Sequence, residues 1–146
     1  MITRKTKYAL SALVHLARKS KEGPILISRL AREERIPKKF LELILLDLKN
    51  SGILQSKRGK GGGYSLSRPA QLIRVSQVVR LFDGPLAPIP CVSETAYQKC
   101  DDCRSEEDCG IRIVMKQVRD ATASILEQTT LADLVIETKG KTKRKR

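Results

Sequence analysis

The apolar residues between positions 37 and 51 recur at the spacing of one helical face. They lie three or four positions apart, so that a helix gathers them into one stripe: Leu41, Ile44, Leu45 and Leu48. The opposite face carries Lys39, Glu42, Leu43, Leu46 and Asn50. Pro37 suits a first turn because its missing N–H has no intrahelical partner there, and Gly52 can adopt the left-handed conformation that ends a helix. The pattern predicts a helix that is buried on one face and free on the other.

Similar periodicity predicts three more helices in the first half of the chain, at about 5–20, 27–36 and 75–82. The helix at 27–36 is followed, after a short turn, by the helix at 37–51. Two helices joined in this way have helix-turn-helix geometry, in which the first lies across a nucleic-acid backbone and the second enters the major groove. The prolines that follow Gly84 are incompatible with regular structure up to residue 90.

Two short apolar segments, at 53–54 and 64–66, flank a basic glycine loop and predict a β-hairpin. Three consecutive glycines in this loop allow the backbone to approach a rigid surface closely, while Lys57, Arg58 and Lys60 supply charge for phosphates or for a narrow minor groove. A mobile, solvated hairpin tip is the alternative interpretation. A nucleotide-binding loop is excluded, because the stretch lacks the last glycine of the dinucleotide fingerprint and has no Gly-Lys-Ser/Thr.

A longer helix is predicted at about 108–128, where apolar residues repeat at intervals of three and four: Ile111, Val114, Val118, Ala121 and Ile125. This seam packs either on the body of the same chain or on a second copy. We expect a homodimer, because proteins that read duplex DNA usually bind as twofold dimers. Thr130 and Asp133 have the spacing of a capping box that starts a short last helix. The basic residues 139–146 are expected to be disordered.

Positive charge is concentrated in the first part of the chain. The formal net charge of the 146 residues is +13; residues 1–82 carry a net +13, residues 83–138 a net −6 and the last eight residues a net +6. A strongly basic half favours a polyanionic partner, with a membrane surface as the competing interpretation. No stretch approaches 18 uninterrupted apolar residues, which argues against a bilayer-spanning segment.

The cytoplasm is the expected compartment. The first residues place positive charge before a short apolar run, as a secretory signal does. That run contains His15 and leads into further basic residues without a small-residue cleavage site, so we reject a signal peptide. His15 is the only histidine and lies far in sequence from every cysteine, so we interpret it as a partly buried or surface residue rather than a ligand.

All four cysteines fall within nineteen residues, at Cys91, Cys100, Cys103 and Cys109. In a cytoplasmic protein such a cluster indicates metal binding or redox chemistry rather than disulfides. Four thiolates can hold zinc or an iron–sulfur cluster, and the spacing alone scarcely separates the two. The acidic residues around the cysteines would raise the thiol pKa unless a cation compensates. Cys109 is the favoured anchor, because it precedes a helix whose dipole stabilises a thiolate.

An enzyme is the rival class of function. A chain with one remote histidine cannot assemble a Ser-His-Asp set, and no pair of carboxylates stands out in an apolar setting. We therefore expect no catalysis.

Several motifs together resemble the Rrf2 family of bacterial winged-helix transcription factors. They are Thr6–Leu10, Ile36 with Phe40–Glu42, the Arg58–Tyr64 loop, the cysteine segment and Thr130–Leu134. The similarity spans about residues 1–136, and the RGKGGGY loop is its most specific part. The resemblance implies a homodimer that binds an imperfect palindrome in double-stranded DNA through the second helix of the pair and the wing, with the long helix as the dimer interface.

The resemblance also implies roles for particular residues. Glu42 would discriminate bases, which agrees with the ability of a carboxylate to accept from cytosine N4, and Arg58 would enter the minor groove. Cys91, Cys103 and Cys109 match the cluster cysteines of the iron–sulfur members. The residues that we expect to contact DNA are Ser28, Lys38, Lys39, Glu42, Lys57, Arg58, Lys60, Gly61 and Tyr64.

Five positions depart from the family pattern. Arg112 stands where the iron–sulfur members have a histidine ligand, and Lys7 stands where some nitric-oxide sensors have an acidic ligand. An arginine does not deprotonate to serve as an ordinary ligand. Cys100 is the additional cysteine, so we infer an all-cysteine site. Lys38 and Lys39 replace uncharged residues, so a different target sequence is expected.

These observations predict a mainly α-helical protein with a small β-hairpin wing. We expect a winged helix-turn-helix domain at 1–82, a cysteine-containing loop at 83–110, a dimerisation helix with a short terminal helix at 111–138, and a tail at 139–146. The expected function is sequence-specific transcriptional regulation that senses iron–sulfur status, redox state or nitric oxide through a [2Fe–2S] or [4Fe–4S] cluster. A regulator with structural zinc or no metal, responding to a metabolite or a partner protein, is the alternative.

Overall fold

The computed structural model describes residues 2–143, with the side chains described up to residue 137. Its elements, in order, are α1 (Arg4–Arg18), η1 (Ser20–Glu22), α2 (Ile27–Glu34), α3 (Lys38–Asn50), β1 (Leu54–Lys57), β2 (Gly63–Leu66), η2 (Ala70–Leu72), α4 (Val75–Asp83), η3 (Pro90–Val92), α5 (Gly110–Gln128) and α6 (Leu131–Lys143). The fold is mainly helical with one two-stranded antiparallel hairpin, which confirms the predicted class. No helix in the described part of the chain is both long and apolar enough to cross a membrane.

The hydrophobic core lies around helix α1, which packs against α2, α3, α4 and α6. The stripe predicted for α3 forms one wall of this core: Leu41, Ile44, Leu45 and Leu48 are all fully buried. Leu13 from α1, Ile73 before α4 and Leu131 at the start of α6 are also fully buried. Burial of these side chains fixes the orientation of α3 and therefore decides which of its residues face solvent.

The hairpin pairs Leu54 with Leu66 at its base and Lys57 with Gly63 at its outer end. Strand β1 is therefore longer toward the loop than predicted. A backbone bridge between Ile25 and Tyr64 fastens the hairpin to the segment before α2, with N···O distances of 2.8 and 2.9 Å. A Cβ atom at Gly63 would collide with the Ile25 carbonyl oxygen, so this close approach requires glycine.

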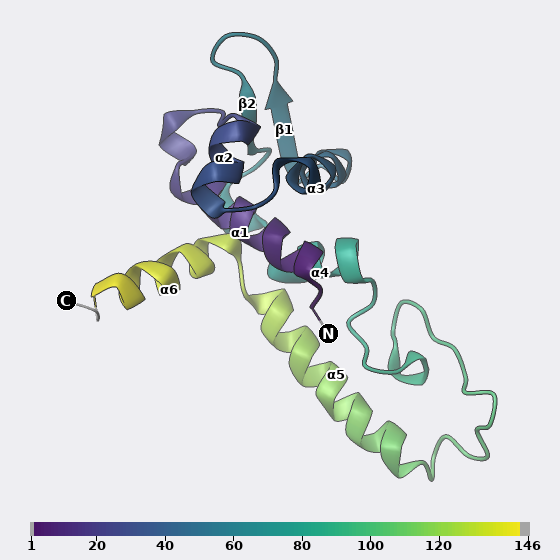
Figure 1. The fold of residues 1–146 in the computed structure, drawn as a ribbon. Coiled ribbons are helices and arrows are strands. Elements are labelled where there is room, and N and C mark those ends of the chain that lie inside the picture. The colour runs from purple at the N-terminus through teal and green to yellow at the C-terminus, as the bar shows by residue number, and fades with distance from the viewer. Residues whose placement is uncertain (1, 144–146) are drawn as a thin grey trace.

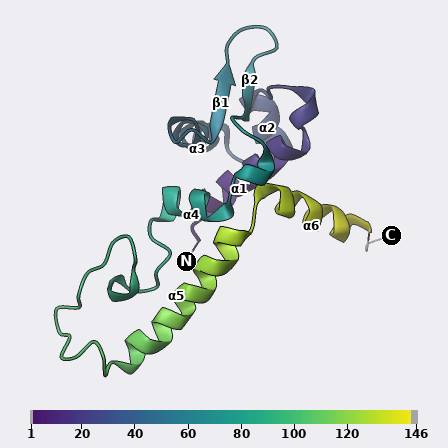
Figure 2. The ribbon, with the colours of Figure 1, turned by 180° about the vertical axis from the view of Figure 1, so that it is seen from behind.

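Helix α5 projects away from residues 1–82, which we call the winged part (Figures 1 and 2). The chain between α4 and α5 runs beside helix α5. The C-terminal end of α5 is held at α4. The Arg80 guanidinium lies 2.5 Å from the Glu127 carboxylate, and the backbone N–H of Val75 donates to the Thr129 carbonyl at 2.9 Å. This junction is where the projecting helix is connected to the core.

Helix α6 begins with the predicted capping box: Asp133 accepts from the N–H and hydroxyl of Thr130, both at 2.8 Å. We expected a short helix and a disordered tail from 139, but α6 continues to Lys143. Residues 144–146 of the expected tail lie outside the described residues.

Candidate nucleic-acid interface and cysteine pocket

Helices α2 and α3 and the hairpin lie together at one end of the molecule, opposite the free end of α5 (Figures 1 and 2). Eight of the nine predicted DNA-contacting residues are exposed there: Ser28, Lys38, Lys39, Glu42, Lys57, Arg58, Lys60 and Gly61. The ninth, Tyr64, is half-buried and packs against the core, where its backbone also forms the bridge to Ile25. Tyr64 therefore positions the wing.

The basic residues of α3 and the hairpin have no acidic partners among the described residues. Among the described side chains, no ion pair involves the lysines and arginine of α3 and the hairpin, which are Lys38, Lys39, Lys49, Lys57, Arg58 and Lys60. Elsewhere in the described chain, Arg29, Arg80 and Arg119 are each paired with a carboxylate. The unpaired cations on one end leave positive charge available for phosphates.

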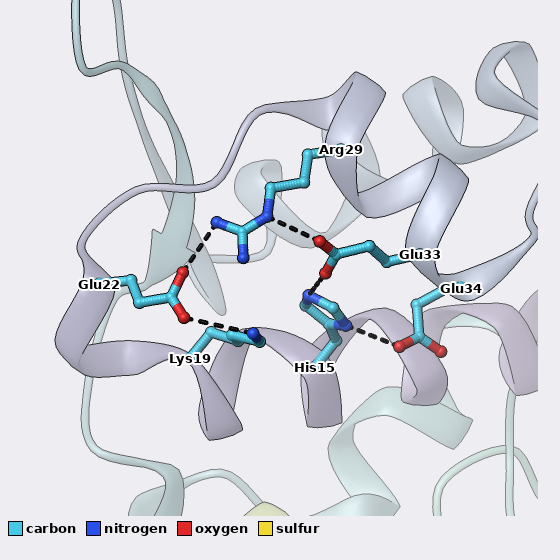
Figure 3. Close-up of polar contacts among 6 residues, drawn as sticks. All are labelled: His15, Lys19, Glu22, Arg29, Glu33 and Glu34. Atoms are coloured by element: carbon cyan, nitrogen blue, oxygen red, sulfur yellow. Dashed lines mark hydrogen bonds and ion pairs between the residues drawn. The ribbon is translucent and has the colours of Figure 1, made fainter.

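The acidic residues of the winged part are almost all occupied in ion pairs. Figure 3 shows most of them in one network that joins α1, η1 and α2, made of His15, Lys19, Glu22, Arg29, Glu33 and Glu34. Hydrogen bonds from Arg29 hold the pKa of both Glu22 and Glu33 below its usual range. Asp47 pairs with Lys5 at 2.9 Å. Among the described acidic residues of 1–82, Glu42 is the one without an ion pair, and it is exposed on α3.

His15 lies buried in this network, with Nδ1 2.7 Å from Glu34 Oε1 and Nε2 2.9 Å from Glu33 Oε2. It ties α1 to α2, and with 7% of its surface exposed it is more deeply buried than the partly buried or surface position that we expected. The helix-turn-helix pair is therefore positioned by polar side-chain contacts as well as by the core.

The glycine loop of the hairpin has two different kinds of glycine. A Cβ atom at Gly62 would collide with the Lys57 carbonyl oxygen, and one at Gly63 with Ile25, so these two positions need glycine for the hairpin's own packing. Gly61 has a φ of 71° and open space around its Cα. Of the three consecutive glycines, only Gly61 is therefore free to bring the backbone close to an external surface.

The four cysteines, all free, line one pocket of about 380 Å³ at the outer end of α5. Cys91 is buried on η3, Cys103 and Cys109 are half-buried, and Cys100 is exposed. A hydrogen bond with the Cys91 thiol, aided by the negative charge of neighbouring groups, raises the pKa of the Cys100 thiol. In the described part of the chain, no three His, Cys, Asp or Glu side chains stand close enough together to form a metal site.

Cys109 is the N-cap of α5, where its sulfur accepts a hydrogen bond from the Arg112 N–H at 3.5 Å. This is the helix-start position proposed from the sequence. The Arg112 side chain lines the same pocket, with an Nε atom that is buried and has no hydrogen-bond partner among the described residues. The pocket therefore combines four soft sulfur donors with two arginines, Arg104 and Arg112, and two aspartates, Asp102 and Asp108.

Arg119 is a structural residue that the sequence analysis missed. It is buried on α5 and pairs with Glu94, in the segment after Cys91, and with Asp120 at 2.7 Å. These contacts fasten the cysteine segment along α5. Nothing in the local sequence singles out Arg119, because the same helix also carries Arg112 and Lys116.

Comparison with known proteins places these features in one family. The model of the Rrf2 family, described as iron-dependent transcriptional regulators, matches residues 2–137. An rrf2-like HTH-type transcriptional regulator of Rhodobacter capsulatus is 44% identical over 138 residues, which are 92% of each chain. The HTH-type transcriptional regulator IscR of Erwinia tasmaniensis is 30% identical over 92% of this chain and 78% of its own length.

The fold agrees with the sequence comparison. The solved structure of CymR, the global cysteine regulator of Bacillus subtilis, matches with a TM-score of 0.79 at 28% identity, covering 94% of this chain and 97% of that one. These relatives are transcriptional regulators, which confirms the prediction that the chain is not an enzyme. The chain belongs to the Rrf2 family of DNA-binding transcriptional regulators.

Proposed function

We propose that this regulator is a homodimer whose affinity for a palindromic operator depends on an iron–sulfur cluster held by Cys91, Cys100, Cys103 and Cys109. The observation that carries the proposal is the convergence of four free thiols on one pocket at the start of α5. The other end of the molecule presents Glu42 beside unpaired cations. Sensing and DNA binding would thus take place at opposite ends of the folded molecule.

The exposed seam of α5 supports the homodimer. Ile111, Val114, Val118 and Ile125 are between 44% and 68% exposed, and so remain uncovered by the rest of the described chain. Contiguous apolar surface of this kind favours association, and two copies related by a twofold axis would bury the same stripe on both. Two recognition helices would then face two half-sites about one turn of DNA apart.

The donor set fits an iron–sulfur cluster in its chemistry, because four thiolates are its usual ligands. A bound cluster would supply sensitivity to oxidation, to nitric oxide and to iron supply. The protein's own part is to hold the four sulfurs and to offset their charge with Arg112, which lines the pocket. The hydrogen bond with Cys91 raises the pKa of the Cys100 thiol, and a metal ligated there would have to displace that proton.

The chain also offers a mechanical connection from the pocket to the winged part. Cys109 caps α5 at one end, and Glu127 and Thr129 hold the other end against α4. A rearrangement of the cysteine segment therefore acts on a single rigid helix that is fixed to the core. In a dimer joined along α5, this shifts the spacing of the two α3 helices and changes the fit to the operator.

The test is to measure the affinity for promoter DNA of anaerobically reconstituted protein and of metal-free protein at matched salt. The proposal predicts different affinities, together with broad visible absorption and acid-labile sulfide in the reconstituted protein. Equal affinities would remove the sensor role and leave DNA binding intact.

A regulator with structural zinc or no metal is the second candidate. It is favoured by the open arrangement of the cysteines, which brings no three ligands together in the described residues, and by the likeness to CymR. A colourless preparation would support this candidate, with stoichiometric zinc indicating a structural site. Such a protein would respond to a metabolite or to a partner protein.

A further inference from the structure

Two leucines stand on the free face of helix α3, where a helix of a soluble domain usually presents polar residues. The side chain of Leu43 is 59% exposed and that of Leu46 is 47% exposed, while the buried stripe of the same helix is fully covered. They lie three positions apart and therefore neighbour each other on the helix surface. Together they form a small apolar strip.

The surroundings of Leu43 indicate what this strip meets. On the helix surface Leu43 lies one turn after Lys39 and next to Glu42, and Lys38 and Lys39 have no ion-pair partner among the described residues. The hairpin with its unpaired cations lies at the same end of the molecule. This charge suits a duplex and does not suit an apolar protein surface.

Leucine has no hydrogen-bond donor or acceptor in its side chain, so it can recognise a base only by apolar contact. In the major groove the thymine C5 methyl group is the apolar feature of a base edge. The residues near the start of a recognition helix are the ones that reach base edges. Leu43 lies in the second turn of α3, whereas Leu46 lies one turn farther along.

We propose that Leu43 is a specificity-determining residue that reads a thymine methyl group beside the base read by Glu42. The proposal rests on DNA binding through α3. Removing one buried methyl group costs about fourfold in affinity. A thymine at this position would be preferred over uracil, which has the same hydrogen-bonding edge and lacks the methyl group.

The experiment uses the full chain and a duplex that it selects from a random pool. Each thymine of the selected duplex is replaced in turn by uracil, and the dissociation constant is measured by fluorescence anisotropy. The wild type is expected to bind about fourfold more weakly when one particular thymine in a half-site is replaced. Leu43→Ala is expected to bind the thymine and uracil duplexes equally, because the contacting side chain is gone.

Leu46→Ala is the matched control, since it removes a similarly exposed leucine from the same face, and it should retain the thymine preference. The proposal is overturned if no thymine shows the effect in the wild type, if Leu43→Ala keeps it, or if Leu46→Ala alone abolishes it. If the full chain selects no duplex from the random pool at low salt, the proposed DNA binding itself is overturned. Because the uracil comparison is made with the wild type, it does not depend on the folding of a variant.

Discussion

Glu42 differs from the other acidic residues of the winged part in its surroundings. The other described acidic residues of the winged part are held in ion pairs, whereas Glu42 is exposed and unpaired on the free face of α3. A carboxylate kept free among cations has no evident stabilising role, and it can accept from cytosine N4 in the major groove. Its position was predictable from helical periodicity, but its lack of partners required the arrangement of α1, η1 and α2.

Glu42→Ala should relax base preference at one position of each half-site, by about 1–3 kcal/mol of discrimination. Lys60→Ala, in the hairpin tip, should instead weaken binding to all sequences and reduce the salt slope by about one. Binding to a panel of single-base operator variants at several salt concentrations separates the two effects. A uniform loss of affinity for Glu42→Ala would refute its assignment as a base reader.

Two glycines of the hairpin have a packing role that the local sequence does not predict. The run of three glycines predicted a flexible close approach, but two of the three are needed because their neighbours are backbone carbonyl groups. The carbonyl of Ile25 is nearly forty residues away in sequence from Gly63. No local pattern could reveal that contact.

Gly63→Ala should therefore destabilise the fold far more than Gly61→Ala. At Gly61 the cost is left-handed strain of about 1–2 kcal/mol, because the space around it is open. At Gly63 the collision with Ile25 adds about 1–3 kcal/mol of backbone adjustment. Urea unfolding of the two variants measures the difference, and equal midpoints would contradict the packing assigned to the wing.

At the scale of elements, the helices of the winged part follow closely from hydrophobic periodicity, because each packs one apolar stripe against the same core. The hairpin was predicted in place, although β1 extends farther toward the loop than its apolar residues indicate. The ends of α1 and α4 are joined by a contact that sequence does not suggest: Thr3 donates from its hydroxyl to Asp83 at 2.6 Å.

This contact has a pH dependence that can be tested. Burial opposes ionisation of Asp83, but hydrogen bonds from Thr3 and Thr6 outweigh it and hold the carboxyl pKa below its usual range. A carboxyl group with a lowered folded-state pKa stabilises the protein above its unfolded pKa, and this contribution is lost as the pH falls through the folded-state value.

Asp83→Asn should lower the free energy of unfolding by about 1 kcal/mol at pH 7 and by much less near pH 3. Denaturant unfolding at the two pH values tests this, with Glu107→Gln on the exposed cysteine segment as the control. A loss that is the same at both pH values would show that charge at Asp83 plays no part.

At the scale of the whole molecule, the sequence placed the cysteines next to α5 and the apolar seam along it. It did not indicate how α5 is fixed to the core, because Arg80 and Glu127 are distant in sequence. The sequence also left open whether the seam packs on the same chain or on a second copy. The exposure of the seam in the described chain leaves a second copy as its proposed partner.

Val118→Asp should disrupt a dimer, because it places a charge in the centre of the seam, where Val118 is 44% exposed in the single chain. Sedimentation should give twice the chain mass of 16.3 kDa for the wild type and the chain mass itself for the variant. Affinity for a palindromic operator should fall by about 100-fold as bivalency is lost. Leu72→Asp, on an exposed leucine of η2, should change neither property.

The measurement that tests the account most directly is the binding of the full wild-type chain to duplex DNA as a function of salt. The unpaired cations of α3 and the hairpin predict tight binding at low salt. They also predict a linear fall of log K with log salt concentration, with a slope of about −0.9 for each phosphate neutralised. A matched variant, Arg58→Ala combined with Lys60→Ala, should reduce that slope by about two. Failure to bind any duplex at low ionic strength would contradict the account, and so would binding that is indifferent to salt.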